Sequence, residues 1–152
     1  GKIVDMGIKD VNNMGVAMAP AAADTLIAHF KDTGTGPKDY DVIMTGDLGI
    51  IGSDILCDLM NREGYDIYSV HKDAGKMIFD INDQDVHAGG SGCGCCATVL
   101  CGYIFKELKN KKLSRILVAA TGALMNTMTV QQGSTIPSIS HAVEISNNMQ
   151  AD

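Results

Sequence analysis

A block rich in glycine and cysteine at residues 87–96, followed by an uncharged run that ends before Lys106, constrains this fold more than any other segment. The glycines allow the backbone a tight turn, and the small residues after it can open a helix. A helix without charges must be enclosed on nearly every side, so we predict a buried central helix over residues 91–108. The run spans roughly 20 Å at helical rise, which is too short to cross a bilayer.

Length, composition and charge restrict the class of protein. A chain of 152 residues predicts one domain, residues 1–152, with a core of its own. Its 17 glycines, 45% hydrophobic residues and 20% charged residues are typical of a globular α/β protein with many turns. The net charge of −6 excludes a nucleic-acid partner, because an acidic surface repels phosphate backbones.

The cysteines favour a reducing compartment. Four of the five lie at residues 93–101, on the predicted central helix, which is unlike a disulfide framework. No second Cys or His pair follows them to complete a tetrahedral zinc site, so we expect no metal there. No targeting segment or membrane span is recognisable, and membrane association is expected only through a partner. Gly1 leads directly into a predicted strand without a start methionine, which predicts a piece of a longer protein.

The periodicity predicts an α/β fold. Strand patterns occur at residues 3–8, 40–45, 86–88, 115–120 and 139–145, and helical patterns at residues 19–30, 53–63 and 91–108. Residues 66–85 give only a weak pattern. Three strand-helix crossovers require parallel neighbours, while the last two strands, joined by the polar loop 121–137, can pair antiparallel. These elements predict a mixed five-stranded sheet with helices on both faces.

Two thiols stand at the start of the central helix. The free N–H groups and the dipole there favour a thiolate, so Cys93 or Cys95 could act as a nucleophile. The alternative is packing or pocket lining, because cysteine is among the residues most often buried.

Asp47 lies in a strand-to-helix turn, residues 46–52. The glycines of this turn resemble a dinucleotide fingerprint, but Leu48 places a side chain where that motif needs its second glycine. The turn is therefore predicted to be structural, with Asp47 at the carboxyl end of a strand, where open sheets often bind ligands.

The remaining candidates are histidines and a glutamine. Period two places His141 with apolar neighbours and predicts a core histidine. His87, beside the glycine turn, is expected to face a pocket, and His29 and His71 to be peripheral. Gln131 lies in a loop that either closes over a site or is an ordinary polar loop.

Three blocks carry a resemblance to a known family: residues 5–10 with 13–22, residues 84–95, and residues 121–124 with 131–143. Together they resemble the stage V sporulation protein AD family, thiolase-like proteins of spore-forming bacteria. The resemblance covers nearly the whole chain and matches only the C-terminal half of such proteins. It implies a second, similar half that is absent here, with the third helix of each half at the centre, residues 91–108 in this chain.

The resemblance also implies lost catalysis. Enzymatic relatives acylate a cysteine in the other half and use a histidine in this half, where the present chain has Gly-Asp-Leu-Gly at residues 46–49. We therefore expect a protein that is not an enzyme. The alternatives are an acyltransferase or thiolase, and a scaffold that docks membrane proteins.

The family is thought to bind dipicolinic acid and to support its uptake with the other stage V sporulation A proteins. By resemblance, the chain is expected on the cytoplasmic side of the spore inner membrane, held there by partners. Calcium is expected only together with dipicolinate, bridging it to Asp47. The expected ligand-binding residues, four at the pocket floor and three at its edge, are Ser91, Gly92, Cys93 and Cys95, then Asp47, His87 and Gln131. An exposed flank of the central helix predicts self-association or pairing with the missing N-terminal half.

Overall fold

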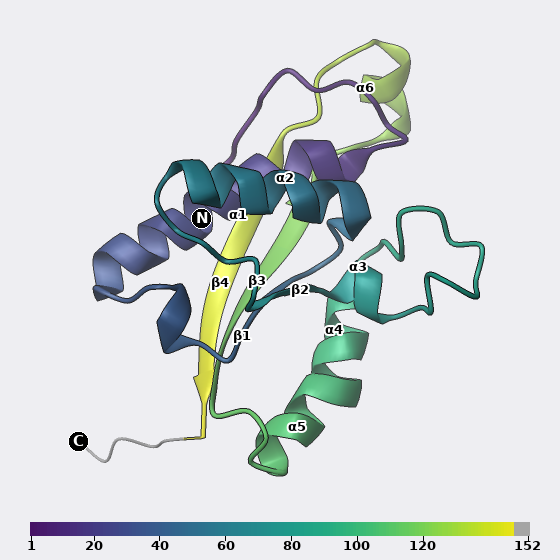
Figure 1. Cartoon of the computed structure of the whole chain (residues 1–152). Helices are drawn as coiled ribbons and strands as arrows, with labels where there is room; N and C mark the ends of the chain where they lie inside the picture. Colours follow the sequence, from purple (N-terminus) through teal and green to yellow (C-terminus); the bar gives the residue numbers. More distant parts are fainter. Residues whose placement is uncertain (148–152) are drawn as a thin grey trace.

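The computed structural model describes residues 1–147, in which four strands form one open mixed sheet with helices on its two faces (Figure 1). The sheet order is β2-β1-β3-β4. β1 runs parallel to β2 and β3, and β3 pairs antiparallel with β4. The strands are β1 (Val42–Thr45), β2 (His71–Asp73), β3 (Arg115–Ala123) and β4 (Ser138–Ser146). The mixed α/β class is confirmed, with four strands in place of the predicted five.

Two of the predicted strands are wrong. Segment 3–8 forms only the isolated bridge between Val4 and Ser138, because a turn at Asp5 to Gly7, where Gly7 has φ +76°, interrupts the pairing before the Ile8 carbonyl accepts from the Ile136 N–H. Residues 86–88 form a turn, with His87 at φ +49°. The strand beside β1 is instead β2, in the weakly patterned region. Its sequence, His-Lys-Asp, has no apolar alternation from which a strand could be predicted.

Helices α1 (Met14–Thr33) and α2 (Gly49–Arg62) pack on one face of the sheet. Both begin earlier than residues 19 and 53, where the predicted helical patterns start. Pro20 lies inside α1, and Ser53 is buried inside α2. The short helices are α3 (Ala74–Met77), α4 (Cys95–Val99), α5 (Phe105–Lys109) and α6 (Thr127–Gln131), with a 3-10 turn at Pro37–Asp39.

Strand β3 separates two cores. Leu117 and Ala119 face α1 and α2, whereas Ile116 and Val118 face α4 and α5, because alternate side chains of a strand point to opposite faces. The unbroken apolar run of β3 is therefore explained by burial on both sides.

The predicted central helix is three pieces, since the π-helical stretch Leu100–Ile104 joins α4 to α5. Its buried residues are Cys95, Val99, Ile104 and Leu108. The step of five from Val99 to Ile104, made possible by the π turn, keeps this stripe on the sheet. The opposite side is exposed over six uncharged residues: Ala97, Thr98, Cys101, Gly102, Tyr103 and Phe105. The prediction of enclosure on nearly every side is thus wrong for the described chain, in which the helix has one covered face. In residues 1–147, no helix has the length and hydrophobicity to span a membrane.

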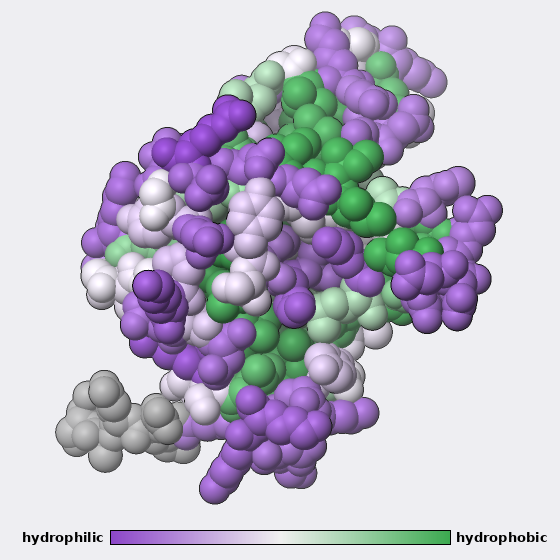
Figure 2. All heavy atoms as spheres, viewed as in Figure 1, coloured by the Kyte–Doolittle hydropathy of each residue, from purple (hydrophilic) through white to green (hydrophobic). Residues whose placement is uncertain are grey.

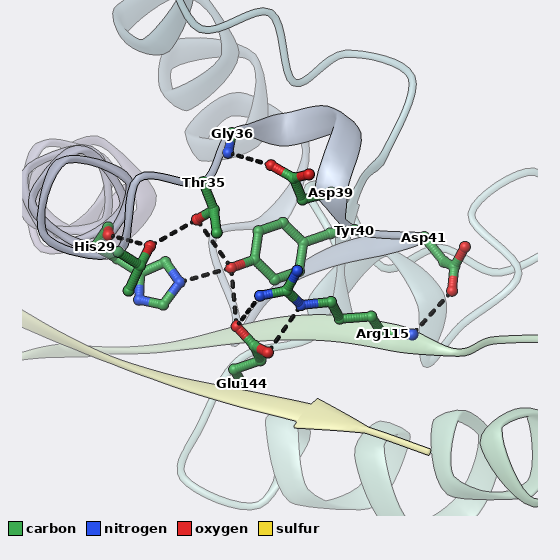
Figure 3. A network of polar contacts seen from close by, with 9 residues as sticks. His29, Thr35, Gly36, Asp39, Tyr40, Asp41, Arg115 and Glu144 are labelled. Atoms are coloured by element: carbon green, nitrogen blue, oxygen red, sulfur yellow. Dashed lines mark hydrogen bonds and ion pairs between the residues drawn. The ribbon is translucent and has the colours of Figure 1, made fainter. Parts of the chain in front are cut away.

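A polar network around the Tyr40 hydroxyl lies at the end of the sheet where β1 and β3 begin (Figure 3). This hydroxyl lies 2.7 Å from His29 Nε2 and 3.1 Å from Thr35 Oγ1, and donates to Glu144 at 3.0 Å. Arg115 binds the same carboxylate through two N–H groups and lies 4.9 Å from the Tyr40 ring centre. The network ties the end of α1 to β3 and β4, so its polar groups have a structural role.

Candidate functional site

A cavity of about 320 Å³ lies where β1 and β3 end, between the start of α1 and the turn before α4. The carboxyl ends of parallel strands meet at this edge, the usual place for a ligand in an open sheet. The residues at its polar end are Asp47, Ser91, Gly92, Cys93, Cys96 and Thr121, and Met14 and Met18 lie on the apolar side.

Asp47 provides the one carboxylate among the described lining residues, which include no lysine, arginine or histidine. Its Oδ1 accepts from the Thr121 hydroxyl at 3.0 Å. Its Oδ2 accepts from the Ser91 hydroxyl at 3.2 Å and from the Gly92 N–H at 3.0 Å. Three donors that a bare anion could use are therefore already bound to an internal carboxylate.

Of the seven predicted site residues, the structure brings Asp47, Ser91, Gly92 and Cys93 together at this cavity. His87 does not line it. Its side chain is exposed, with Nδ1 3.6 Å from an Asp85 carboxylate oxygen. Gln131, also exposed, ends α6 on an arm that projects from the sheet (Figure 1).

Cys95 is buried and lies outside the cavity lining, whereas Cys96, which was not predicted, lines it. Burial, followed by the charges of Asp47 and Asp73, raises the pKa of Cys95 to about 11. Burial likewise raises the pKa of Cys96. The thiolate expected from the helix start is thus disfavoured at Cys95, because desolvation of the charged form outweighs the effect of a short helix.

A chain of polar groups, in which Thr45, Cys57 and Asp73 are buried and His71 is half-buried, lies next to the cavity and was not predicted from the sequence. His71, predicted to be peripheral, has Nε2 2.9 Å from Thr45 Oγ1 and Nδ1 3.6 Å from Cys57 Sγ. The Thr45 hydroxyl donates to Asp73 at 2.6 Å. Burial, with smaller effects from two nearby lysines, lowers the pKa of His71 to about 4. The spacing His-x-Asp on a strand, which places both side chains on one face, was the available sign of this cluster.

His141, predicted to be a core histidine, is exposed. It shares a sheet face with Val143 as expected, but α4 and α5 cover β1 and β3 and leave this part of β4 open. Among the described residues, no group of three His, Cys, Asp or Glu side chains is placed to hold a metal ion.

The glycine block forms a backbone clamp beside Asp47. Ile50 N–H donates to the Ala88 carbonyl at 2.8 Å, and Gly90 N–H donates to the Gly75 carbonyl at 2.7 Å. Gly89 has φ +116°, a conformation that side chains rarely allow. The prediction that these glycines form a tight turn before a helix is confirmed.

The sequence model of the family described as stage V sporulation protein AD (SpoVAD) matches residues 1–146. The chain belongs to the SpoVAD family. Stage V sporulation protein AD of Bacillus subtilis (strain 168) is 50% identical over 143 residues. The match covers 94% of this chain and 42% of the relative, so the SpoVAD segment described here spans less than half of that protein. Membership of the SpoVAD family implies a role in sporulation.

Proposed function

We propose that this chain forms the C-terminal, thiolase-like half of a non-catalytic sporulation protein that binds dipicolinic acid and supports its uptake into the spore. Family membership supports the sporulation role. The cavity at the strand ends, with Asp47 at its polar end, is the observation that carries the ligand proposal.

The charge of the cavity selects the form of the ligand. Dipicolinate is a dianion near neutral pH, and a carboxylate 4 Å from Asp47 would be repelled by about 4 kcal/mol at an effective dielectric of 20. A calcium ion between the two carboxylates turns this repulsion into attraction, because calcium prefers oxygen ligands and takes six to eight of them. We therefore propose that the cargo is calcium dipicolinate, with Asp47 supplying one oxygen to the ion.

Non-catalytic binding agrees with the thiols around the cavity. The high pKa of Cys95 leaves little thiolate at neutral pH, and no histidine lines the described cavity to act as a base. The enzyme alternative, an acyltransferase or thiolase, requires a thiol that gains the mass of an acyl group from acyl-CoA, which mass spectrometry would detect.

Replacing Asp47 by asparagine is expected to weaken calcium dipicolinate binding at least about tenfold, the effect of losing one charged contact to the ion. Isothermal titration of the chain with dipicolinate, with and without calcium, measures the effect. The control is Asp83→Asn, an exposed carboxylate on the loop before the glycine block, which should bind as the wild type does. Equal binding by the Asp47 variant, or calcium-independent binding by the wild type, would contradict the proposal.

We further propose that the uncovered side of α4 and α5, with the adjoining β4 face, packs against the remainder of the longer protein. Tyr103 is 52% exposed there and Val143 59%, and exposed apolar side chains gathered on one face mark interaction surfaces. Figure 2 shows further hydrophobic residues, on the face viewed, between α2 and the arm that carries α6. Other stage V sporulation A proteins at the inner membrane would hold the assembly at its cytoplasmic side, which is also the location expected of a scaffold.

Without that remainder, the chain is expected to self-associate through the same surface. In sedimentation velocity experiments, Tyr103→Ser should raise the dimer dissociation constant about tenfold, because burial of an aromatic ring is lost. Tyr68→Ser removes a tyrosine of similar exposure, 56%, elsewhere on the surface and should leave dimerisation unchanged. A wild-type chain that stays monomeric at its highest attainable concentration would refute the pairing surface.

A further inference from the structure

We infer that Asp73 is a positioning residue for the cavity: it holds the turn that carries Asp47 without lining the cavity itself. Its effect on ligand binding rests on the proposed function, whereas its effect on the position of Asp47 does not.

The Asp73 carboxylate accepts hydrogen bonds from both sides of Asp47 in the sequence. The Thr45 hydroxyl donates to Oδ2 at 2.6 Å, and Leu48 N–H donates to the same oxygen at 2.9 Å. Gly49 N–H donates to Oδ1 at 2.9 Å. One donor precedes Asp47 by two residues and the other two follow it directly, so the backbone of the turn is held before and after the side chain that enters the cavity.

Burial makes this restraint strong. Asp73 is only 2% exposed, and hydrogen bonds to an ionised group in a dry environment are stronger than those in water. Burial raises the pKa of Asp73, while the bonds from Thr45, Leu48 and Gly49 oppose that rise. The donors of the turn thus favour the charged form of the buried Asp73 carboxylate, and the carboxylate in return holds the turn in place.

The same turn is fixed to the glycine block that provides the partners of Asp47. Gly49 has φ +67°, and a side chain there would lie 2.6 Å from the Ala88 carbonyl oxygen. Ser91 and Gly92, which donate to Asp47, follow this clamp directly. Asp73 and the clamp therefore set the two ends of the Asp47 to Gly92 hydrogen bond.

Thr45, in β1, connects the restraint to His71, which lies in β2 together with Asp73. Because its hydroxyl gives its one proton to Asp73, it accepts from His71 Nε2–H at 2.9 Å. A serine at this position keeps the hydroxyl, whereas valine keeps the shape and removes both hydrogen bonds.

Amide hydrogen exchange of Gly92 in the unliganded chain tests the inference, because this N–H is bound to Asp47. Asp73→Asn should accelerate exchange at Gly92 about tenfold or more, the factor expected when a charge-assisted hydrogen bond is lost. The matched control is Asp41→Asn. Asp41 also accepts two backbone N–H bonds, from Ser114 and Arg115, at the far end of the sheet. The Asp41→Asn variant should lower the free energy of unfolding without changing the rate of amide exchange at Gly92.

Equal exchange at Gly92 in the two variants would overturn the positioning role. If Asp73→Asn does not fold, Thr45→Val should accelerate exchange at Gly92 and Thr45→Ser should restore it; failure of the serine variant to do so would equally overturn it. Titration with calcium dipicolinate adds a second measurement, with a dissociation constant about tenfold higher in Asp73→Asn and unchanged in Asp41→Asn. A wild-type chain that does not bind calcium dipicolinate would reject the proposed function, while the exchange result would still decide the role of Asp73.

Discussion

Replacing Gly52 by alanine is expected to lower the free energy of unfolding by about 2 kcal/mol, the typical effect of overpacking a close contact. Gly52 lies in α2 where this helix crosses α1 at Gly15. A Cβ at Gly52 would lie 2.9 Å from both the Cα and the carbonyl oxygen of Gly15. Because these are backbone atoms, the two helices would have to separate, which would loosen the core around Met18 and Leu56.

Chemical denaturation measures this effect, and the chain offers a matched control. Gly102 also lies in a helical segment, but an added Cβ there would meet nothing within 4 Å. Gly102→Ala should therefore raise stability by roughly 0.5–1 kcal/mol through helix propensity alone. If Gly52→Ala also stabilised the protein, the close packing of α1 on α2 would be wrong.

Acidification from pH 7 to pH 4 is expected to remove about 3 kcal/mol of stability through His71 alone. The pKa of this imidazole falls from 6.5 to about 4 in the folded protein, mainly through burial. Between these values the unfolded chain binds a proton at His71 that the folded chain does not. Stability is thus fully present above pH 6.5 and is lost as the pH falls toward 4.

Urea unfolding at several pH values tests this linkage. His71→Gln should have a shallower fall of stability with pH than the wild type, whatever its stability at pH 7. His141→Gln, which alters an exposed imidazole, should keep the wild-type slope. An unchanged slope in the His71 variant would show that this histidine is not held neutral by burial.

The sequence predicted those parts of the fold that rest on apolar periodicity. Helix α2 and the central strand β3 were recognisable because their burial imposes a regular pattern. Strand β2 was not, because its inward side chains, His71 and Asp73, are polar and are satisfied by partners distant in the sequence. The exposed flank of α4 and α5 has the apolar composition of a buried helix, so sequence alone suggested a cover that residues 1–147 do not supply.

The residues of the candidate site also divide into those that the sequence could predict and those that it could not. Asp47 was predicted because the carboxyl ends of parallel strands form the usual ligand-binding edge of an open sheet. Residues 91–93 were predicted from the resemblance to the SpoVAD family and from their place at the start of the predicted central helix. His87 and Gln131 lie outside the cavity lining, because the backbone angles that place a turn residue or a short helix such as α6 are not revealed by composition. Asp73 was missed because its role arises from three donors brought together only by folding.

The Asp47 carboxylate at the polar end of the cavity limits which ligands the proposed site can accept. Cells contain many small acids, and a site built from free amide groups or cationic side chains would accept them indiscriminately. Here the Asp47 carboxylate already accepts from the Ser91 and Thr121 hydroxyls and from the Gly92 N–H. A simple phosphate or carboxylate therefore meets a like charge. Under the proposed function, a ligand that carries its own cation gains from entering, so selectivity would depend on net charge before it depends on shape.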